Sequence, residues 1–496
     1  MTTPILLAVD QGTTSSRAVL FDDAGRILSS HSVAFKQHYP QPGWVEHEPE
    51  DILRSVTEAI QTAVSLVDNA AANIVAMGIT NQRETTLVWE KATGRCVCPA
   101  IVWQCRRTAS YVEKIEKDGM SETIREKTGL IPDAYFSATK LKYILDTLGL
   151  HERAENGELC FGTVDSFLCW HLCENHPHVT DESNASRTML YNIHLHKWDN
   201  ELLEYFGIPE KMLPRVVSSA EAVGMLSPMI IGKPIPMCSL AGDQHAALFG
   251  QACFDEGMVK NTYGTGCFML MNTGSECVQS KKKLISTVAW RLSGKTTYAI
   301  EGSVFVAGAA IQWLRDEMGL ISSAQESEAL ASSVKDTGGV YCVPSFTGLG
   351  APYWDMYSRG TIIGITRGTG RAHIVRAVLE SIAYQSQDLL NAIIEGSGVT
   401  PKNMRVDGGA SANGFLMQFQ ADISGIPIVR PQTIETTALG AALFAGYAIG
   451  LYPTVDDIRK YVRRDSEFTP KMSEDERSAR LRKWHDAVQR SMDWAK

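Results

Sequence analysis

Near its N-terminus the chain reads ILLAVDQGTTSSRAVLF over residues 5–21. An apolar run predicts a buried strand, a polar turn around Gly12 follows, and a second apolar run predicts a strand that returns beside the first. The turn offers the hydroxyls and amide groups of residues 13–15, a donor-rich concavity suited to phosphate oxygens. Asp10, at the end of the first strand, is placed to reach a magnesium ion held by those phosphates. The stretch therefore predicts a β-hairpin with a phosphate-binding tip.

Taken alone, such a short stretch is as compatible with an ordinary surface hairpin. The other half of the chain, however, repeats the pattern, because residues 261–271 read NTYGTGCFMLM. Further on, MRVDGGAS at residues 404–411 places two glycines between a predicted strand and a predicted helix, where a nucleotide can lie against the backbone. Two phosphate turns and a glycine-rich loop resemble the ATPase domain pair shared by actin, Hsp70, hexokinase and the FGGY carbohydrate kinases.

That resemblance implies an α/β fold with two ribonuclease-H-like (actin-like ATPase) domains flanking a catalytic cleft. The length of 496 residues is too great for a single core and predicts two or three domains. We expect an N-terminal domain over residues 1–250, with the acceptor site and the first phosphate turn. The C-terminal domain over residues 251–496 would hold the nucleotide site and the second turn.

The composition is that of a globular protein, with 44% hydrophobic and 21% charged residues. The net charge is −9 and the longest basic run is Lys281–Lys283, so nucleic acid is not expected as a partner. The sequence predicts no signal peptide and no membrane insertion, which favours a cytoplasmic location. Eleven scattered cysteines indicate reduced thiols.

One segment resembles a zinc site in its residue types and spacing. It contains two cysteines and two histidines, Cys169, Cys173, His176 and His178. The segment 164–173 is nevertheless apolar at helical spacing. We therefore predict a buried helix there rather than a metal site, since a free cysteine behaves as a small hydrophobe.

After the hairpin, residues 27–35 predict a third strand and residues 49–67 an amphipathic helix with proline and acids in its first turn. Residues 74–80 predict a buried strand that delivers Asn-Gln-Arg83-Glu84 to its carboxyl end, where ligands sit in open α/β sheets. As a bare pair, Arg83 and Glu84 are also compatible with a solvated loop.

Longer motifs remove that ambiguity. The chain reads GITNQRETT at 78–86, IVWQCRR at 101–107, NASRTML at 184–190 and FTGLGAPYWD at 346–355. These motifs resemble the glycerol-phosphorylating members of the FGGY family, and the resemblance covers nearly the whole chain. It implies an ATP-dependent kinase of glycerol catabolism that makes sn-glycerol 3-phosphate and ADP with Mg²⁺, and it implies a homo-oligomer, either a dimer or a tetramer.

Site residues follow from the same resemblance. The expected nucleotide contacts are Thr13, Thr14, Ser15, Arg17, Thr265, Gly308, Gln312, Gly409 and Asn413, with Asp10 holding the metal through water. The expected acceptor contacts are Arg83, Glu84, Trp103, Tyr135, Asp243, Gln244 and Phe268, with Trp103 and Phe268 packing on the carbon atoms of the substrate.

Asp243 lies in LAGDQHAALF at residues 240–249 and has the place of the family's catalytic base. A helix N-cap is the alternative role for an aspartate in this position, and the two roles are compatible. His245 stands where bacterial relatives would be expected to carry glutamine, beyond the predicted acceptor contacts.

Two other functions stay open from the sequence. One is a kinase of the same family acting on another polyol or sugar, which the acceptor motifs disfavour. The other is a non-catalytic nucleotide switch related to actin or Hsp70, which would bind ATP without needing a polyol.

Overall fold

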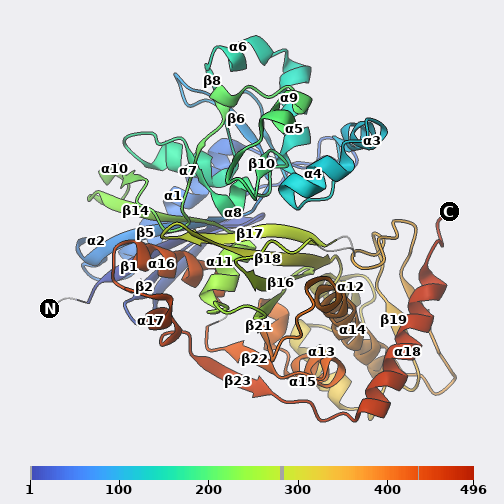
Figure 1. The fold of residues 1–496 in the computed structure, drawn as a ribbon. Helices are drawn as coiled ribbons and strands as arrows, with labels where there is room; N and C mark the ends of the chain where they lie inside the picture. The colour runs from blue at the N-terminus through green and yellow to red at the C-terminus, as the bar shows by residue number, and fades with distance from the viewer. Residues whose placement is uncertain (1–2, 280–283, 434) are drawn as a thin grey trace.

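The computed structural model describes residues 3–279, 284–433 and 435–496, so the basic run at 281–283 lies outside the described residues. Two large mixed β-sheets, one from each half of the chain, form the centre of the molecule, and helices cover them (Figure 1). The predicted α/β fold with two sheet-centred units is confirmed.

The first sheet has six strands in the order β13-β14-β5-β1-β2-β3. β1 (Ile5–Gln11) and β2 (Ser15–Asp22) form the predicted hairpin, and β3 (Ile27–Ala34) continues it antiparallel. β5 (Ile74–Asn81) and β14 (Ile235–Gly242) run parallel to β1. Their carboxyl ends meet at one edge of the sheet, which brings the loop after β5 beside the start of α11 (Asp243–Gly250).

The second sheet repeats this plan with seven strands in the order β17-β18-β16-β15-β21-β22-β23. β15 (Val259–Tyr263), β16 (Cys267–Gly274) and β18 (Lys295–Val304) are antiparallel neighbours. β21 (Met404–Asp407) and β22 (Ile428–Pro431) run parallel to β15. The β1–β2 and β15–β16 turns therefore hold equivalent places in the two sheets.

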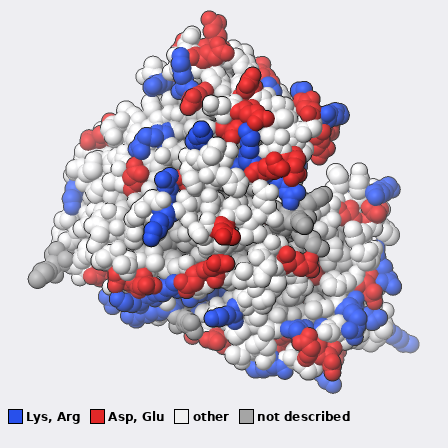
Figure 2. All heavy atoms as spheres, in the orientation of Figure 1, with Lys and Arg blue, Asp and Glu red and all other residues white. Residues whose placement is uncertain are grey.

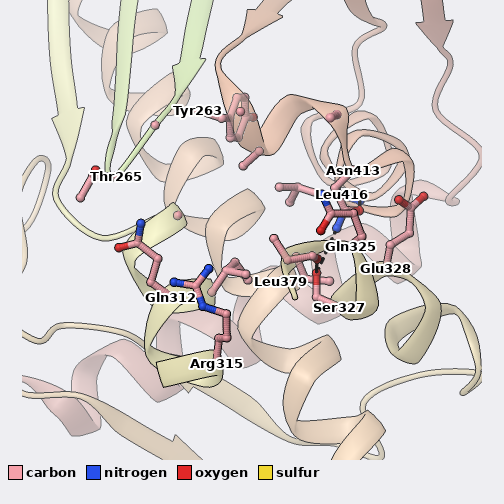
Figure 3. Close-up of a pocket in the computed structure, with 17 residues that line it drawn as sticks. Tyr263, Thr265, Gln312, Arg315, Gln325, Ser327, Glu328, Leu379, Asn413 and Leu416 are labelled. Atoms are coloured by element: carbon pink, nitrogen blue, oxygen red, sulfur yellow. Dashed lines mark hydrogen bonds between the residues drawn. The ribbon is translucent and has the colours of Figure 1, made fainter. Parts of the chain in front are cut away.

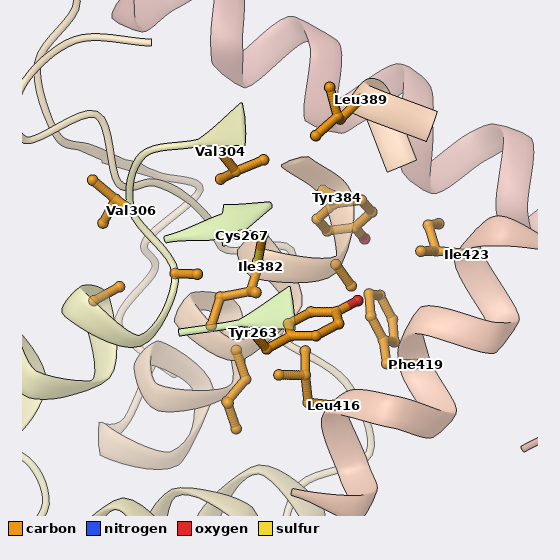
Figure 4. Close-up of a cluster of buried hydrophobic side chains, with 14 of the residues drawn as sticks. Tyr263, Cys267, Val304, Val306, Ile382, Tyr384, Leu389, Leu416, Phe419 and Ile423 are labelled. Carbon is orange, nitrogen blue, oxygen red and sulfur yellow. The ribbon is translucent and has the colours of Figure 1, made fainter. Parts of the chain in front are cut away.

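The remaining elements of the second sheet and of its helical cover are β17 (Ile285–Leu292), β23 (Arg464–Phe468), α12 (Gly308–Asp316), α13 (Ala324–Ser332), α14 (Arg371–Ser397), α15 (Gly414–Ser424) and α18 (Glu474–Ser491). Figure 4 shows side chains of the hairpin strands, among them Tyr263 and Cys267, packed with Tyr384 of α14 and Phe419 of α15. The Tyr263 hydroxyl donates to Gln420 Oε1 at 2.9 Å, so the one polar group on that ring is satisfied inside the core.

One helix of the C-terminal half completes the first sheet. α16 (Thr436–Ala448) follows β22 in the chain, yet it packs on β1, β5 and β14. Ser239 Oγ of β14 donates to the carbonyl of Ala441 at 3.1 Å. The other face of this sheet is covered by α1 (Pro49–Ser65), as its apolar spacing predicts. A boundary at residue 250 thus stays a prediction, because the core of the first sheet includes residues 436–448.

α11 and α16 cross between the two sheets with their backbones in contact. A Cβ added at Gly250 would lie 2.0 Å from the carbonyl oxygen of Thr436, and one at Gly440 would lie 1.9 Å from that of Ala246. Real Cβ atoms do not come so near a carbonyl, so this crossing requires glycine at both positions.

A helical layer inserted after β5 lies above the first sheet at the top of Figure 1. Its main elements are β6 (Leu87–Glu90), α3 (Ala109–Lys117), α4 (Ser121–Thr128), α5 (Ser137–Leu148), α6 (His151–Glu155), β8 (Leu159–Gly162), α7 (Val164–Leu172), α8 (Glu182–Ala185) and α9 (Asn200–Phe206). α7 confirms the helix predicted at 164–173. Cys169 Sγ lies buried 3.3 Å from Met237 Sδ, as a packing residue would.

Acidic and basic side chains are interspersed on the face shown in Figure 2, rather than gathered by sign. Among the described helices, none has the length and apolar character needed to cross a membrane.

Candidate active site

The two predicted phosphate turns are closed by short backbone hydrogen bonds. Gly12 N donates to Ser15 O at 2.9 Å, and Gly264 N donates to Gly266 O at 2.9 Å. The second turn is further fixed by α12, because Gly308 N donates to Gly264 O at 3.0 Å. The amide of Ala309 likewise donates to Thr265 O at 3.1 Å. The N-terminus of α12 is thus held against the turn, where its positive dipole end favours an anion.

A cavity of about 320 Å³ opens beside this second turn (Figure 3). It lies between α12, α13, α15 and the glycine-rich loop after β21. Five predicted nucleotide contacts line it together: Thr265, Gly308, Gln312, Gly409 and Asn413. Asn413 Oδ1 also caps α15 by accepting from Leu416 N at 2.9 Å. The cavity has the size of a small-molecule site and is walled largely by backbone and short side chains.

The sequence did not single out the far wall of this cavity. Arg315 of α12 and Gln325, Ser327 and Glu328 of α13 line it as well. Ser327 Oγ accepts from Asn413 Nδ2 at 3.4 Å, which joins that wall to the predicted contacts.

The first phosphate turn lies outside this cavity. Thr13 Oγ1 accepts from Trp103 Nε1 at 3.0 Å, and Thr14 O accepts from Phe35 N at 3.2 Å. Arg17 Nε donates to Ser32 Oγ at 2.7 Å and the same guanidinium pairs with Glu435. The positive charge expected to face phosphate is therefore already paired with a carboxylate in this structure.

Asp10 is half-buried on β1, and burial together with the nearby carboxylates of Asp243 and Glu435 raises its pKa to about 7. Carboxylates gathered in this way suit a divalent cation, which would relieve their repulsion. Within the described ranges, no three metal-ligating side chains form a cluster. A metal here would accordingly depend on substrate oxygens and water as well as on Asp10, which fits the coordination that Mg²⁺ prefers.

The predicted acceptor residues meet in a buried ionic cluster between the two sheets. Arg83 follows β5, and its Nε lies 3.0 Å from Asp243 Oδ1. Its two terminal nitrogens donate to both carboxylate oxygens of Glu301 on β18, at 2.7 and 2.9 Å. Such a bidentate pair fixes the guanidinium plane as well as its position.

Glu84 takes part in the same cluster from a strained backbone. Its φ of 61° lies in the left-handed region, which is uncommon for a residue with a side chain. Glu84 Oε1 accepts from Arg187 Nε at 2.6 Å, and Arg187 also reaches Glu301 at 3.2 Å. Two acids and two arginines, all 3% exposed or less, thus balance their charges out of water.

This arrangement shifts the titration of its acids in opposite directions. Burial alone would raise the pKa of Glu301, but the guanidiniums of Arg187 and Arg83 outweigh it and hold that pKa well below its usual value. Burial raises the pKa of Glu84, although the same two guanidiniums oppose the shift. Glu301 is therefore the fixed anion of the cluster.

Asp243 differs from those acids because its side chain is 31% exposed. It is the first residue of α11, whose N-cap is Gly242, so the structure does not give Asp243 the N-cap role. Its Oδ1 accepts from Gln244 N at 2.7 Å and forms an ion pair with Arg83. One carboxylate oxygen is thereby oriented, and the exposed remainder of the group is available to a substrate hydroxyl.

Aromatic rings stand beside this cluster. Trp103 and Tyr135 pack edge to face with their ring centroids 5.6 Å apart, and the Arg187 guanidinium lies 5.7 Å from the Tyr135 ring centroid. Phe268, half-buried, lies on β16 opposite Ser303. These positions are compatible with apolar contacts to the carbon atoms of a small acceptor.

Sequence reasoning missed Arg187 and Glu301 as parts of the site. Both carried a usable signal, since each is a single charge within an otherwise apolar or small-residue segment, where an unpaired charge is expensive. His245 lies behind the cluster, fully buried, with Nε2 3.3 Å from Thr287 Oγ1, and burial lowers its pKa well below the usual value.

Comparisons with known proteins agree with this geometry. The model of the N-terminal domain of the FGGY family of carbohydrate kinases matches residues 5–250, and that of the C-terminal domain matches residues 259–449. A glycerol kinase of Caldanaerobacter subterraneus is 56% identical over 99% of both chains. One of Deinococcus radiodurans is 54% identical over 99% of this chain and 98% of its own.

Solved structures share the fold. The crystal structure of Plasmodium falciparum glycerol kinase with ADP has a TM-score of 0.93 and 32% identity, covering 99% of this chain and 98% of its own. A xylulose kinase of Lactobacillus acidophilus has a TM-score of 0.87 at 21% identity, covering 98% of this chain and 97% of its own, which supports the fold alone.

Proposed function

The chain belongs to the FGGY family of carbohydrate kinases, and from that premise we propose that it is an ATP-dependent glycerol kinase. It transfers the γ-phosphoryl group of ATP to glycerol and releases sn-glycerol 3-phosphate and ADP. The relatives that are more than half identical over nearly the whole chain bear that name.

One structural observation carries the proposal most directly. The end of β5, the start of α11 and the strand β18 converge so that Arg83 orients the partly exposed carboxylate of Asp243 beside a buried ionic cluster. A polyol hydroxyl both donates and accepts, so adjoining carboxylates and amide groups meet it from both sides.

Asp243 acts as the base in this proposal. A glycerol oxygen forms the new bond to the γ-phosphorus while the bond from that phosphorus to ADP breaks, and the hydroxyl proton passes to the Asp243 carboxylate. A carboxylate suffices because the transition state is loose and the hydroxyl becomes acidic only as the new bond forms. The fixed guanidinium of Arg83 keeps the base in place.

The nucleotide would occupy the cavity beside the second turn, with its phosphates directed to the turn at residues 264–266. Bound Mg²⁺ would supply positive charge to those phosphates, and Asp10 is the residue that would hold it. We also predict a cytoplasmic homo-oligomer, for which light scattering after size-exclusion chromatography is the test.

ADP release coupled to a panel of acceptors tests the function. We expect glycerol-dependent release with Mg²⁺ and little release with xylulose, gluconate or no acceptor. Release that favours a sugar would point to another family activity. ATP turnover with no need of any acceptor would favour a nucleotide switch.

A further inference from the structure

A fully buried lysine lies at the junction of the two halves and belongs neither to the ionic cluster nor to the lining of the nucleotide cavity. Lys260 on β15 is 0% exposed. Its Nζ donates to Thr262 Oγ1 at 2.8 Å, to the carbonyl of Phe268 at 3.3 Å, and to Gln244 Oε1. These three acceptors match the three N–H groups of an ammonium, so the charged head is fully satisfied.

The bond to Gln244 fixes the direction of its carboxamide. A carboxamide has one accepting oxygen and one donating NH₂ group, and either end can face a neighbour. An ammonium can only donate, so Lys260 must take the oxygen of Gln244. The NH₂ end of a predicted acceptor contact is then left for the substrate.

The same three bonds span the two halves of the molecule. Gln244 lies in the first turn of α11, directly after Asp243, whereas Thr262 and Phe268 flank the second phosphate turn and pair with each other across β15 and β16. Lys260 therefore couples the position of an acceptor contact to the hairpin whose turn is expected to hold phosphate.

Burying this ammonium is costly, which indicates that packing is not its purpose. Burial lowers the pKa of Lys260 to about 8, although the carboxylates of Asp407 on β21, Asp243 on α11 and Glu301 on β18 oppose the shift and Arg83 adds to it. An apolar side chain of similar length would fill the space without that cost.

We propose that Lys260 is a positioning residue of the transfer reaction, which holds the Gln244 carboxamide with its NH₂ group toward the acceptor and keeps it in register with the second phosphate turn. This rests on the proposed function and identifies how its acceptor specificity is set. Lys260 itself touches no reacting atom.

The test compares Lys260→Met and Gln244→Leu with the double variant, by steady-state kinetics in both substrates. Each single change should raise the KM for glycerol up to about tenfold, the upper end of the net value of a hydrogen bond between uncharged groups, with the KM for ATP unchanged. The double variant should be no worse than either single one, since both remove the same contact. Effects that multiply in the double variant, or an equal rise in the KM for ATP, would overturn the proposal.

Gln244→Glu tests the direction of the amide. A carboxylate keeps the bond to Lys260 but presents no NH₂ group, so we expect the KM for glycerol to rise as it does for Gln244→Leu. Wild-type glycerol kinetics in Gln244→Glu would show that the NH₂ group is not used, and the proposal would fail.

Thr57→Val on α1 is the matched control, because it removes a half-buried hydroxyl that donates to the carbonyl of Leu53 at 2.9 Å and takes no part in either candidate site. Its KM values for glycerol and ATP should stay near the wild-type values. If Lys260→Met fails to fold, the glycerol kinetics of Lys260→Arg and Gln244→Glu decide whether Lys260 positions Gln244 or serves stability alone. Absence of glycerol-dependent ADP release in the wild-type protein would count against the proposed function instead.

Discussion

The acceptor cluster and the nucleotide cavity belong to one candidate site, yet the first consists of buried charged side chains and the second is open space. The cluster around Arg83 and Glu301 consists of charged side chains, largely withdrawn from water and joined by four ion pairs. The cavity beside Thr265 is open space of about 320 Å³, walled by glycines, alanines and short polar residues together with apolar side chains and the longer polar side chains of α12 and α13. The cluster is fully packed in the absence of a ligand, whereas the cavity is empty space that a ligand can enter.

This contrast has a physical consequence for selectivity. Fixed charges and dipoles discriminate strongly against an acceptor that lacks a hydroxyl, because the protein groups are then left unpaired. A cavity of backbone groups recognises phosphate and ring shape with few side chains. We therefore expect side-chain changes in the cluster to cost more than comparable changes around the cavity.

The largest effect should come from Asp243→Asn, which retains the shape of the side chain but removes the base. We expect kcat to fall by about 10²–10⁴, the usual contribution of a positioned acid–base group. The KM for ATP and the affinity for ADP should stay unchanged, since the cavity is untouched. Steady-state kinetics and calorimetric titration with ADP measure both, and near wild-type turnover would make Glu84 the next acid to test.

Glu301→Gln should have the next largest effect, on stability. Removing the carboxylate of Glu301 leaves the positive charges of Arg83 and Arg187 buried without enough negative charge to balance them. The expected loss in the free energy of unfolding is about 3–5 kcal/mol. Urea unfolding measures the loss. Glu113→Gln, which breaks an exposed pair with Lys117 at 4.0 Å, is the control and should cost less than about 1 kcal/mol. Equal losses of unfolding free energy in Glu301→Gln and Glu113→Gln would refute the special contribution of the buried cluster.

Because of Glu301, we expect the free energy of unfolding to depend on pH in the acid range. The pKa of Glu301 is held below its ordinary value of 4.5, so its contribution to stability is present above that pH and is lost as the pH falls. The slope attributable to one such group approaches about 1.4 kcal/mol per pH unit. Unfolding free energies measured between pH 3 and pH 6 should show this slope below about pH 4.5 in the wild-type protein and a smaller slope there in Glu301→Gln.

The smallest effect should come from Gly308→Ala at the edge of the cavity. The added Cβ would lie 2.5 Å from the Gly264 carbonyl oxygen and would displace the second phosphate turn. Relieving this contact requires the backbone of the turn to move by at least about 0.5 Å, so we expect the KM for ATP to rise about tenfold, about 1.4 kcal/mol. Gly368→Ala, whose nearest contact would be an ordinary 3.8 Å, should leave both KM values unchanged.

Much of the fold was predictable because its signals are local. The hairpin at residues 5–21, its copy at 261–271 and the helix beginning at Pro49 all depend on patterns within twenty residues, and each is present. Of the five nucleotide contacts that share the cavity, Thr265 and Gly409 lie in the turn and the glycine-rich loop that such patterns identify, whereas the assignment of all five depended on the family resemblance.

The acceptor cluster was only half predictable. Arg83 and Glu84 stand together in a recognisable motif, but their partners Arg187 and Glu301 lie more than 100 residues away in the chain. Lys260 is likewise one charge in a buried strand. From the sequence alone, each of these three charges indicates that a buried partner exists. Only the packing of the two sheets identifies that partner.

The placement of α16 has a consequence for how the protein is made. β1, β5 and β14 have all been synthesised by residue 242, but the helix that covers one face of their sheet ends at residue 448. At about 5–20 residues per second the interval lasts roughly 10–40 s, during which a nascent chain presents an uncovered apolar sheet. Chaperones should therefore engage the nascent chain in this window. A product truncated before residue 436 should aggregate, and residues 1–250 expressed alone should fail to fold, although they hold a complete sheet.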